Sequence, residues 1–202
     1  MEQAETDVKI RILKSAKRLF AKQGFEGTSV RQICEEAGAN VALVSYHFGG
    51  KEKVFQAIFE HFFPGTPEAF KENEAILADP VEGLRLIAGE IVKFTMQEKE
   101  LSDIVQQELT LQSPRLGVVL SFLNPVWLTV KDLLVRGKAR GDFRFESMTS
   151  ALLMVFGVAL SHKRFGNLEY LADLREEDFA ENYPEQAVRF IMLGLGVKTN
   201  NE

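Results

Sequence analysis

Apolar residues recur every three or four positions along most of the 202-residue chain, which is the period of amphipathic α-helices. The short stretch at residues 142–145 alternates in the manner of a strand, and it is the one candidate for a strand. Capping residues, glycines and prolines divide the helical pattern into segments. We predict helices over residues 7–23, 29–37, 41–46, 51–63, 67–78, 81–98, 102–112, 115–140, 147–165 and 183–197. The sequence therefore predicts an all-α fold.

The first predicted helix separates apolar and basic side chains onto opposite faces, because successive residues are about 100° apart. The apolar face carries Ile10, Leu13, Ala16 and Phe20. The basic face carries Arg11, Lys14, Arg18 and Lys22. Such a face suits contact with phosphate groups, although many basic faces are only solvated surface.

Two short predicted helices follow, over residues 29–37 and 41–46, and a turn centred on Gly38 joins them. Thr28 and Asn40 precede them as predicted N-caps. The spacing predicts that a small core fixes the pair, made by Val30, Ile33, Ala37, Val44 and Phe48. This is the pattern of a helix-turn-helix unit, which inserts its second helix into the major groove of DNA.

A proline- and glycine-rich linker at residues 64–67 predicts a boundary between an N-terminal domain, residues 1–63, and a larger helical domain, residues 64–202. The net charge of −5 argues against a nucleic-acid partner only until it is divided between them. Residues 1–63 hold nine lysines and arginines against eight acidic residues, and residues 64–202 hold fifteen against twenty-one. Because residues 8–25 contain no acidic residue, a local basic surface remains possible.

Several classes of function are not supported by the sequence. A lone Cys34, predicted to lie in the core, excludes an internal disulfide and a cysteine zinc cluster. The strongly apolar run at residues 151–160 is too short for a bilayer span and the acidic N-terminus is unlike a signal peptide, so we expect a cytoplasmic protein without a membrane partner. No catalytic motif occurs, and the adjacent pair Glu35 and Glu36 would diverge on a helix. We therefore expect no catalysis, no cofactor and no metal site.

Residues 7–63 resemble the TetR (tetracycline repressor) family in a run of landmarks. These are the basic amphipathic helix, the segment Phe20–Ile33, the pair Ala37-Gly38, and the segment Tyr46-His47-Phe48-Gly49-Gly50-Lys51-Glu52. The resemblance implies an N-terminal DNA-binding domain and a helical domain for effector binding and dimerisation. The DNA-binding residues that it implies are Arg18, Thr28, Ser29, Arg31, Asn40, Val41, Ala42, Leu43, Ser45, Tyr46, His47 and Lys51.

Within that set the resemblance implies separate roles. Thr28 caps the second helix and meets a phosphate, Tyr46 and His47 contact phosphate and base edges, and Lys51 grips the DNA backbone. Many members place lysine or threonine at the positions of Val41 and Leu43. The uncharged recognition helix would therefore depend on thymine methyl groups, on its hydroxyl groups and on DNA shape.

The resemblance also implies that the second domain encloses an apolar pocket for a small effector, although any one of its aromatic residues is equally suited to the core. The candidate lining residues are Phe94, Leu109, Phe122, Val126 and Trp127, with Glu108 and Gln112 as polar contacts for the effector.

Residues 148–160 are apolar nearly all round, which predicts burial on both sides and hence coverage by a second subunit. The last predicted helix is its expected companion in a four-helix interface. The candidate interface residues are Leu152, Val155, Phe156, Ala159, Val188, Ile191 and Leu195. A two-fold dimer would read a palindrome.

The sequence thus predicts a homodimeric transcription regulator, most simply a repressor of a palindromic operator that a small apolar effector relieves. Two alternatives stay open. The first is a helical ligand-binding or scaffolding protein without DNA binding, which the uncharged recognition helix favours. The second is a nucleoid-associated DNA-binding relative.

Overall fold

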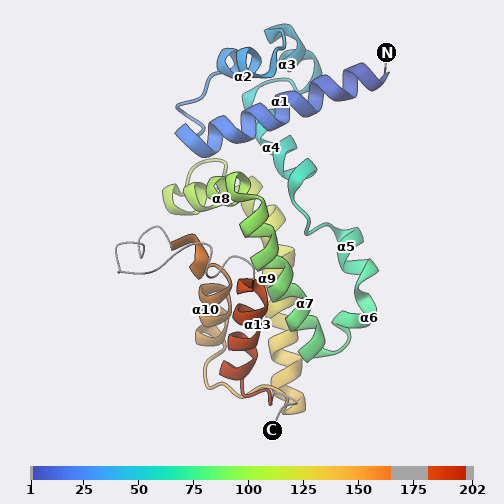
Figure 1. Cartoon of the computed structure of the whole chain (residues 1–202), viewed down its shortest axis with the longest axis vertical. Coiled ribbons are helices and arrows are strands. Elements are labelled where there is room, and N and C mark those ends of the chain that lie inside the picture. Colours follow the sequence, from blue (N-terminus) through green and yellow to red (C-terminus); the bar gives the residue numbers. More distant parts are fainter. Residues whose placement is uncertain (1, 165–181, 199–202) are drawn as a thin grey trace. The chain divides into compact units, whose positions relative to one another are not determined.

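A computed structural model describes residues 2–164 and 182–198 of the chain (Figure 1). In this described part the regular structure is helical throughout, which confirms the all-α prediction. Residues 142–145 form no strand there. The elements are α1 (Glu2–Gln23), α2 (Val30–Ala37), α3 (Val41–His47), α4 (Lys51–Phe62), α5 (Pro67–Glu72), α6 (Glu74–Leu77), α7 (Pro80–Gln97), α8 (Lys99–Leu111), α9 (Leu116–Arg140), α10 (Met148–Ala159), the 3₁₀ helix η1 (Ser161–Arg164) and α13 (Tyr183–Gly194).

Local signals explain most of the helix ends. Gly38 ends α2 with a left-handed φ of 60°, and its N–H donates to carbonyl groups of the last turn of that helix. The predicted helix at residues 67–78 is instead two, because Asn73 turns the chain between α5 and α6. The predicted helix at residues 147–165 ends earlier, at Ala159, and a 3₁₀ turn follows it.

The chain packs as two compact units. Unit 1 comprises Met1–Pro64 and Glu98–Leu123, and unit 2 comprises Gly65–Gln97 and Asn124–Glu202. The first change of unit coincides with the predicted linker, but α8 and the beginning of α9 pack with the N-terminal helices. The division of labour between a DNA-binding domain and an effector-binding domain stays a prediction.

A row of aromatic rings forms the centre of unit 1. Phe55 is 1% exposed, and its ring centroid lies 5.8 Å from that of Phe20, 5.6 Å from that of Phe25 and 5.3 Å from that of Phe59. The ring of Phe122, on α9, stacks on Phe59 at 5.5 Å. These contacts tie α1, α4 and the start of α9 into one core.

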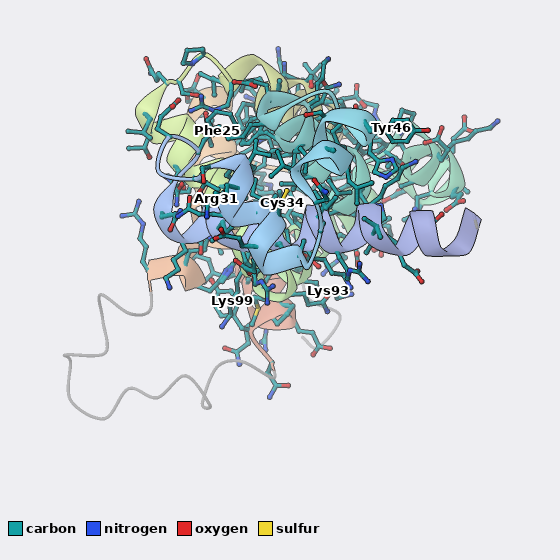
Figure 2. All side chains as sticks on the ribbon, turned by 90° about the horizontal axis from the view of Figure 1, so that it is seen from above. Phe25, Arg31, Cys34, Tyr46, Lys93 and Lys99 are labelled. Atoms are coloured by element: carbon teal, nitrogen blue, oxygen red, sulfur yellow. The ribbon has the colours of Figure 1, made fainter. Side chains whose placement is uncertain are left out.

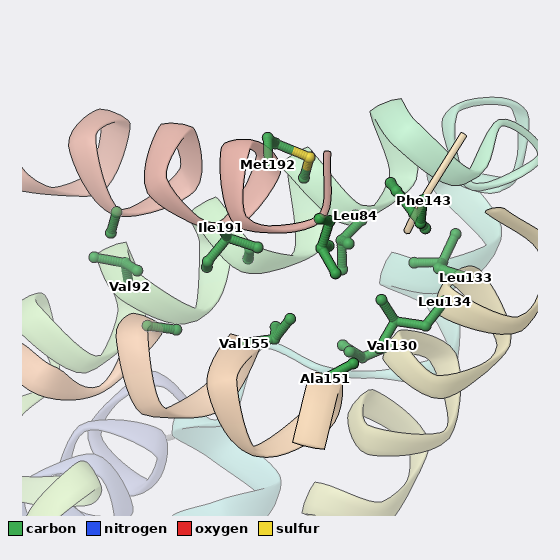
Figure 3. Close-up of a cluster of buried hydrophobic side chains, with 14 residues drawn as sticks. Leu84, Val92, Val130, Leu133, Leu134, Phe143, Ala151, Val155, Ile191 and Met192 are labelled. Carbon is green, nitrogen blue, oxygen red and sulfur yellow. The ribbon is translucent and has the colours of Figure 1, made fainter. Parts of the chain in front are cut away.

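In unit 2 the core lies among α7, α10, α13 and the C-terminal half of α9. Figure 3 shows their aliphatic side chains pointing toward one another, with Phe143 at one end of the cluster. Gly137 gives this ring its place, since a Cβ atom there would lie 2.1 Å from Cδ2 of Phe143. The core therefore requires glycine at this point of α9.

The predicted interface residues of α10 and α13 differ in their burial within unit 2. Val155, Ala159, Ile191 and Leu195 are buried against the core of unit 2. Leu152, Phe156 and Val188 are half-buried against the same core. The exposed large apolar side chains of these two helices are instead Leu153, Met154, Phe190 and Leu193.

By length and composition, α9 is apolar enough to cross a membrane. Core helices of globular proteins pass the same test. Here α9 contributes Val119 to the interior of unit 1, and Val130, Leu133 and Leu134 to that of unit 2.

Candidate nucleic-acid interface

The helix-turn-helix begins at a capping box. Ser29, not Thr28, is the N-cap of α2: its hydroxyl accepts from the Gln32 N–H at 3.2 Å, and its own N–H donates to Gln32 Oε1 at 2.8 Å. Because these two bonds satisfy donors at the start of α2, they fix how the helix leaves the preceding turn.

Thr28 has a different role from the predicted one. Its side chain is buried, its hydroxyl donates to the Gly24 carbonyl at 2.8 Å, and Gln23 Nε2 donates to that hydroxyl at 3.3 Å. The Thr28 hydroxyl thus closes the turn between α1 and α2. Since it is buried, it is not placed to meet a phosphate.

The predicted recognition helix α3 exposes the residues expected of it except Leu43. Asn40 caps it by accepting from the Ala42 N–H at 2.9 Å, and Val44 is fully buried beneath it. Its exposed side chains are Val41, Ala42, Ser45 and Tyr46, whereas Leu43 and His47 are half-buried. Tyr46 is 78% exposed and is labelled in Figure 2. A small, mostly uncharged surface with one phenol at its end is therefore open to solvent.

The two arginines predicted to contact DNA are paired with acidic residues of α2. Arg18 Nη2 lies 2.7 Å from Glu36 Oε1, and Arg31 Nε donates to Glu35 Oε1 at 2.8 Å. The hydrogen bond to Glu35 raises the pKa of the exposed Arg31 guanidinium (Figure 2). Other basic side chains of α1, those of Arg11, Lys14 and Lys22, are exposed as predicted.

Lys51 is half-buried and makes contacts inside unit 1. Its ammonium group donates to the carbonyl groups of Phe25 at 3.0 Å and of Thr28 at 2.9 Å, and lies 4.1 Å from the centroid of the Phe25 ring. An ammonium has three N–H donors, so one remains beyond these two bonds. Lys51 therefore connects the beginning of α4 to the turn between α1 and α2.

Cys34 is buried, as predicted, and its sulfur is visible among the helices of unit 1 in Figure 2. Burial raises the pKa of the thiol. A protonated thiol in the core of the unit fits a packing role.

The seven predicted effector residues are divided between the two units. Phe94, Val126 and Trp127 belong to unit 2, where Trp127 packs against Phe156. Glu108, Leu109, Gln112 and Phe122 belong to unit 1. That these seven residues line one pocket stays a prediction.

Two residues of the effector set have other partners. The Glu108 carboxylate is buried and is bonded to Arg115 and Ser113, and Phe122 stacks on Phe59. The sequence does not predict the pairing of Arg115 with Glu108, because α8 ends at Leu111 and Pro114 follows, so the two residues do not share one helix.

Comparison with known proteins identifies this arrangement. The family model described as bacterial regulatory proteins, tetR family, matches residues 12–58, which hold the whole helix-turn-helix. The HTH-type transcriptional repressor NicS of Pseudomonas putida is 32% identical over 148 residues, which cover 71% of this chain and 70% of NicS. The chain belongs to the TetR family.

Other TetR-family comparisons agree over greater lengths. HTH-type transcriptional regulator UidR of Escherichia coli K12 is 24% identical over 195 residues, covering 89% of this chain and 88% of UidR. The crystal structure of HlyIIR, a hemolysin II transcriptional regulator, superposes with a TM-score of 0.75 at 24% identity, covering 96% of this chain and 99% of that one. These relatives are regulators and not enzymes, and this TetR-family chain is a DNA-binding transcriptional regulator.

Proposed function

We propose that this protein is a homodimeric repressor that binds a palindromic operator in the cytoplasm and releases it when a small apolar effector binds. The observation that carries the proposal is the exposed face of α3, held by the Ser29 and Asn40 caps. Val41 and Ala42 suit thymine methyl groups, and Ser45 and Tyr46 offer hydroxyl groups to bases or phosphates. NicS, which is similar to this chain, is a transcriptional repressor, and this supports repression as the direction of control.

A second copy of the chain is the proposed partner of α10 and α13. Leu153 and Met154 on α10 are 70% and 69% exposed, and Phe190 on α13 is 66% exposed. Exposed apolar side chains of this size on two packed helices favour coverage by another apolar surface. A two-fold axis there would set two copies of α3 against two half-sites.

The proposed effector would bind in the second predicted domain, residues 64–202. A hollow of about 600 Å³ is lined by residues of α10, α13 and the segment before α10, among them Arg144, Ser150, Met154 and Phe190. None of the seven predicted effector residues lines this hollow. Because it lies on the proposed dimer surface, we assign it to that surface rather than to the effector.

Selection of bound DNA from a random pool tests the proposal. We expect an enriched palindrome, whose binding weakens at least tenfold between about 50 and 200 mM salt because phosphate contacts release counterions. Repeating the selection with candidate apolar effectors should identify one that abolishes enrichment. Absence of any enriched sequence would favour the ligand-binding or scaffolding alternative, and general binding without a motif would favour a nucleoid-associated protein.

Glu36→Gln is expected to strengthen operator binding at low salt by about two- to threefold. This fold-change corresponds to the free energy that an exposed ion pair usually contributes. The change frees the Arg18 guanidinium and removes a carboxylate from the face of α2. Titration of labelled operator measures it. The matched control is Glu90→Gln, which breaks the exposed pair with Lys93 in unit 2 and alters the net charge equally. Equal affinity changes in both variants would show that Arg18 has no local part in binding.

A further inference from the structure

The ring of Phe25, in the turn between α1 and α2, is in contact with two cations. Lys51 Nζ is 4.1 Å from its centroid, and Arg115 Cζ is 3.9 Å away. Lys51 comes from the first residue of α4, whereas Arg115 lies just before α9, outside the helix-turn-helix. Cations over an aromatic face are attracted by its quadrupole, so the ring links these two elements.

Arg115 is itself held firmly. Its Nε donates to Glu108 Oε1 at 3.3 Å, its Nη1 donates to Glu26 Oε1 at 2.9 Å, and its side chain is only 13% exposed. The Glu108 side chain is 4% exposed and also accepts from the Ser113 hydroxyl. A buried carboxylate needs a paired cation, so Glu108 has a strong reason to keep the guanidinium in place.

The turn that Arg115 contacts carries the start of the DNA-reading unit. Lys51 donates to the carbonyl groups of Phe25 and Thr28, and the next residue, Ser29, is the N-cap of α2. A shift of the Phe25 ring would therefore move the N-terminal ends of both α2 and α4.

Two further contacts join the same outside segment to α1. Gln107 Nε2 donates to the Ala21 carbonyl at 2.7 Å. Lys17, which is buried, pairs with Glu98 and lies 3.4 Å from Glu100. The segment from Glu98 to Arg115 thus contacts α1 at Lys17 and Ala21. Arg115 adds a contact with the turn between α1 and α2.

We propose that Arg115 is a positioning residue for operator reading: it fixes the α1–α2 turn, and with it α2 and α4, without touching DNA. This inference rests on the proposed function. It makes the choice of operator depend on a residue outside the motif. A substitution of Arg115 would weaken the sequence-specific contacts of α3 with the bases. The sequence-independent attraction to phosphates would stay the same.

The test compares the wild-type chain with two variants, using the operator from selection and a random-sequence duplex of equal length. The double variant Arg115→Gln/Glu108→Gln removes the charges of the buried pair together, so no lone buried charge is left and the net charge is unchanged. Arg115→Lys keeps a cation beside Glu108 but cannot hold both carboxylates in the same planar fork. The matched control is Arg136→Lys, at an arginine of unit 2 whose guanidinium also makes several hydrogen bonds, in its case to Asp132 and to two carbonyl groups.

We expect the ratio of operator to random-DNA affinity to fall about fivefold or more in the double variant, the lower range of coupling between sites. Arg115→Lys should show a smaller fall in the same direction, and Arg136→Lys none. The slope of affinity against salt should not change. If the double variant does not fold, as judged by circular dichroism, Arg115→Lys alone decides.

Three results would separate the possibilities. Wild-type protein that selects no operator refutes the proposed function itself. Wild-type protein that binds its operator, together with an unchanged affinity ratio in the folded variants, refutes the positioning role and leaves Arg115 a residue of stability only. A salt slope reduced by about one would mean that Arg115 contacts a phosphate directly, which also overturns the proposal.

Discussion

Phe55→Ala is expected to lower the free energy of unfolding of unit 1 by about 3–5 kcal/mol, among the largest effects of any single truncation in the chain. The ring is 1% exposed and touches Phe20, Phe25 and Phe59. Its loss leaves a cavity in a core that joins α1 to α4 and cannot collapse without moving both. Because the Phe25 ring also carries Lys51 and Arg115, operator binding should be lost together with stability.

Chemical denaturation followed by circular dichroism measures the first effect, and titration of labelled operator the second. The matched control is Leu111→Ala, in the same unit, whose side chain is 70% exposed and whose truncation should change stability by less than about 0.5 kcal/mol. A similar small change in Phe55→Ala would mean that the aromatic row is not the support of the DNA-reading helices.

The sequence was most informative where local chemistry decides the structure. The alternation of apolar and basic side chains on α1, the cap at Asn40 and the left-handed stop at Gly38 each depend on nearby residues. They were predictable for that reason. The N-cap of α2 is one residue later than predicted, at Ser29 and not Thr28. Both are good capping residues, and only the capping box with Gln32 distinguishes them.

The sequence did not predict contacts between residues that are distant along the chain. No local pattern shows that Lys51 bonds the Phe25 and Thr28 carbonyl groups, or that Glu108 pairs with Arg115. The same holds for residues 98–123, whose helical pattern says nothing of which unit they join. The pairing of a buried acid with a base can be recognised only in the folded structure, where the two side chains are in contact.

The sequence also could not tell which face of α10 is open to a partner. Helix α10 is apolar nearly all round, so its periodicity cannot choose between the face toward the core of its own unit and the face toward a partner. The structure makes the choice: Val155 and Ala159 face the core, and Leu153 and Met154 face outward. Ala159→Glu would therefore place a carboxylate in the core and unfold unit 2, so it cannot serve as a test of dimerisation.

Phe190→Glu is the test that the structure supports, and we expect it to convert a dimer into a folded monomer. The side chain is 66% exposed, so a carboxylate there faces water in the monomer but would be buried without a partner in the proposed dimer. A monomer contacts one half-site at a time and loses the avidity of two linked DNA-binding units. Operator affinity should therefore fall by at least about a hundredfold. The melting temperature of the monomer itself should change little.

Sedimentation velocity gives the oligomeric state, and titration of the full palindrome and of a single half-site gives the loss of joined binding. Ile76→Glu is the matched control, since Ile76 is also an exposed apolar residue of unit 2, at 44%, but lies on α6. We expect that variant to remain dimeric and to bind as the wild type does. A Phe190→Glu protein that is still dimeric would place the subunit contact on another surface. A monomeric variant with undiminished binding of the palindrome would instead mean that the operator is read by one subunit alone.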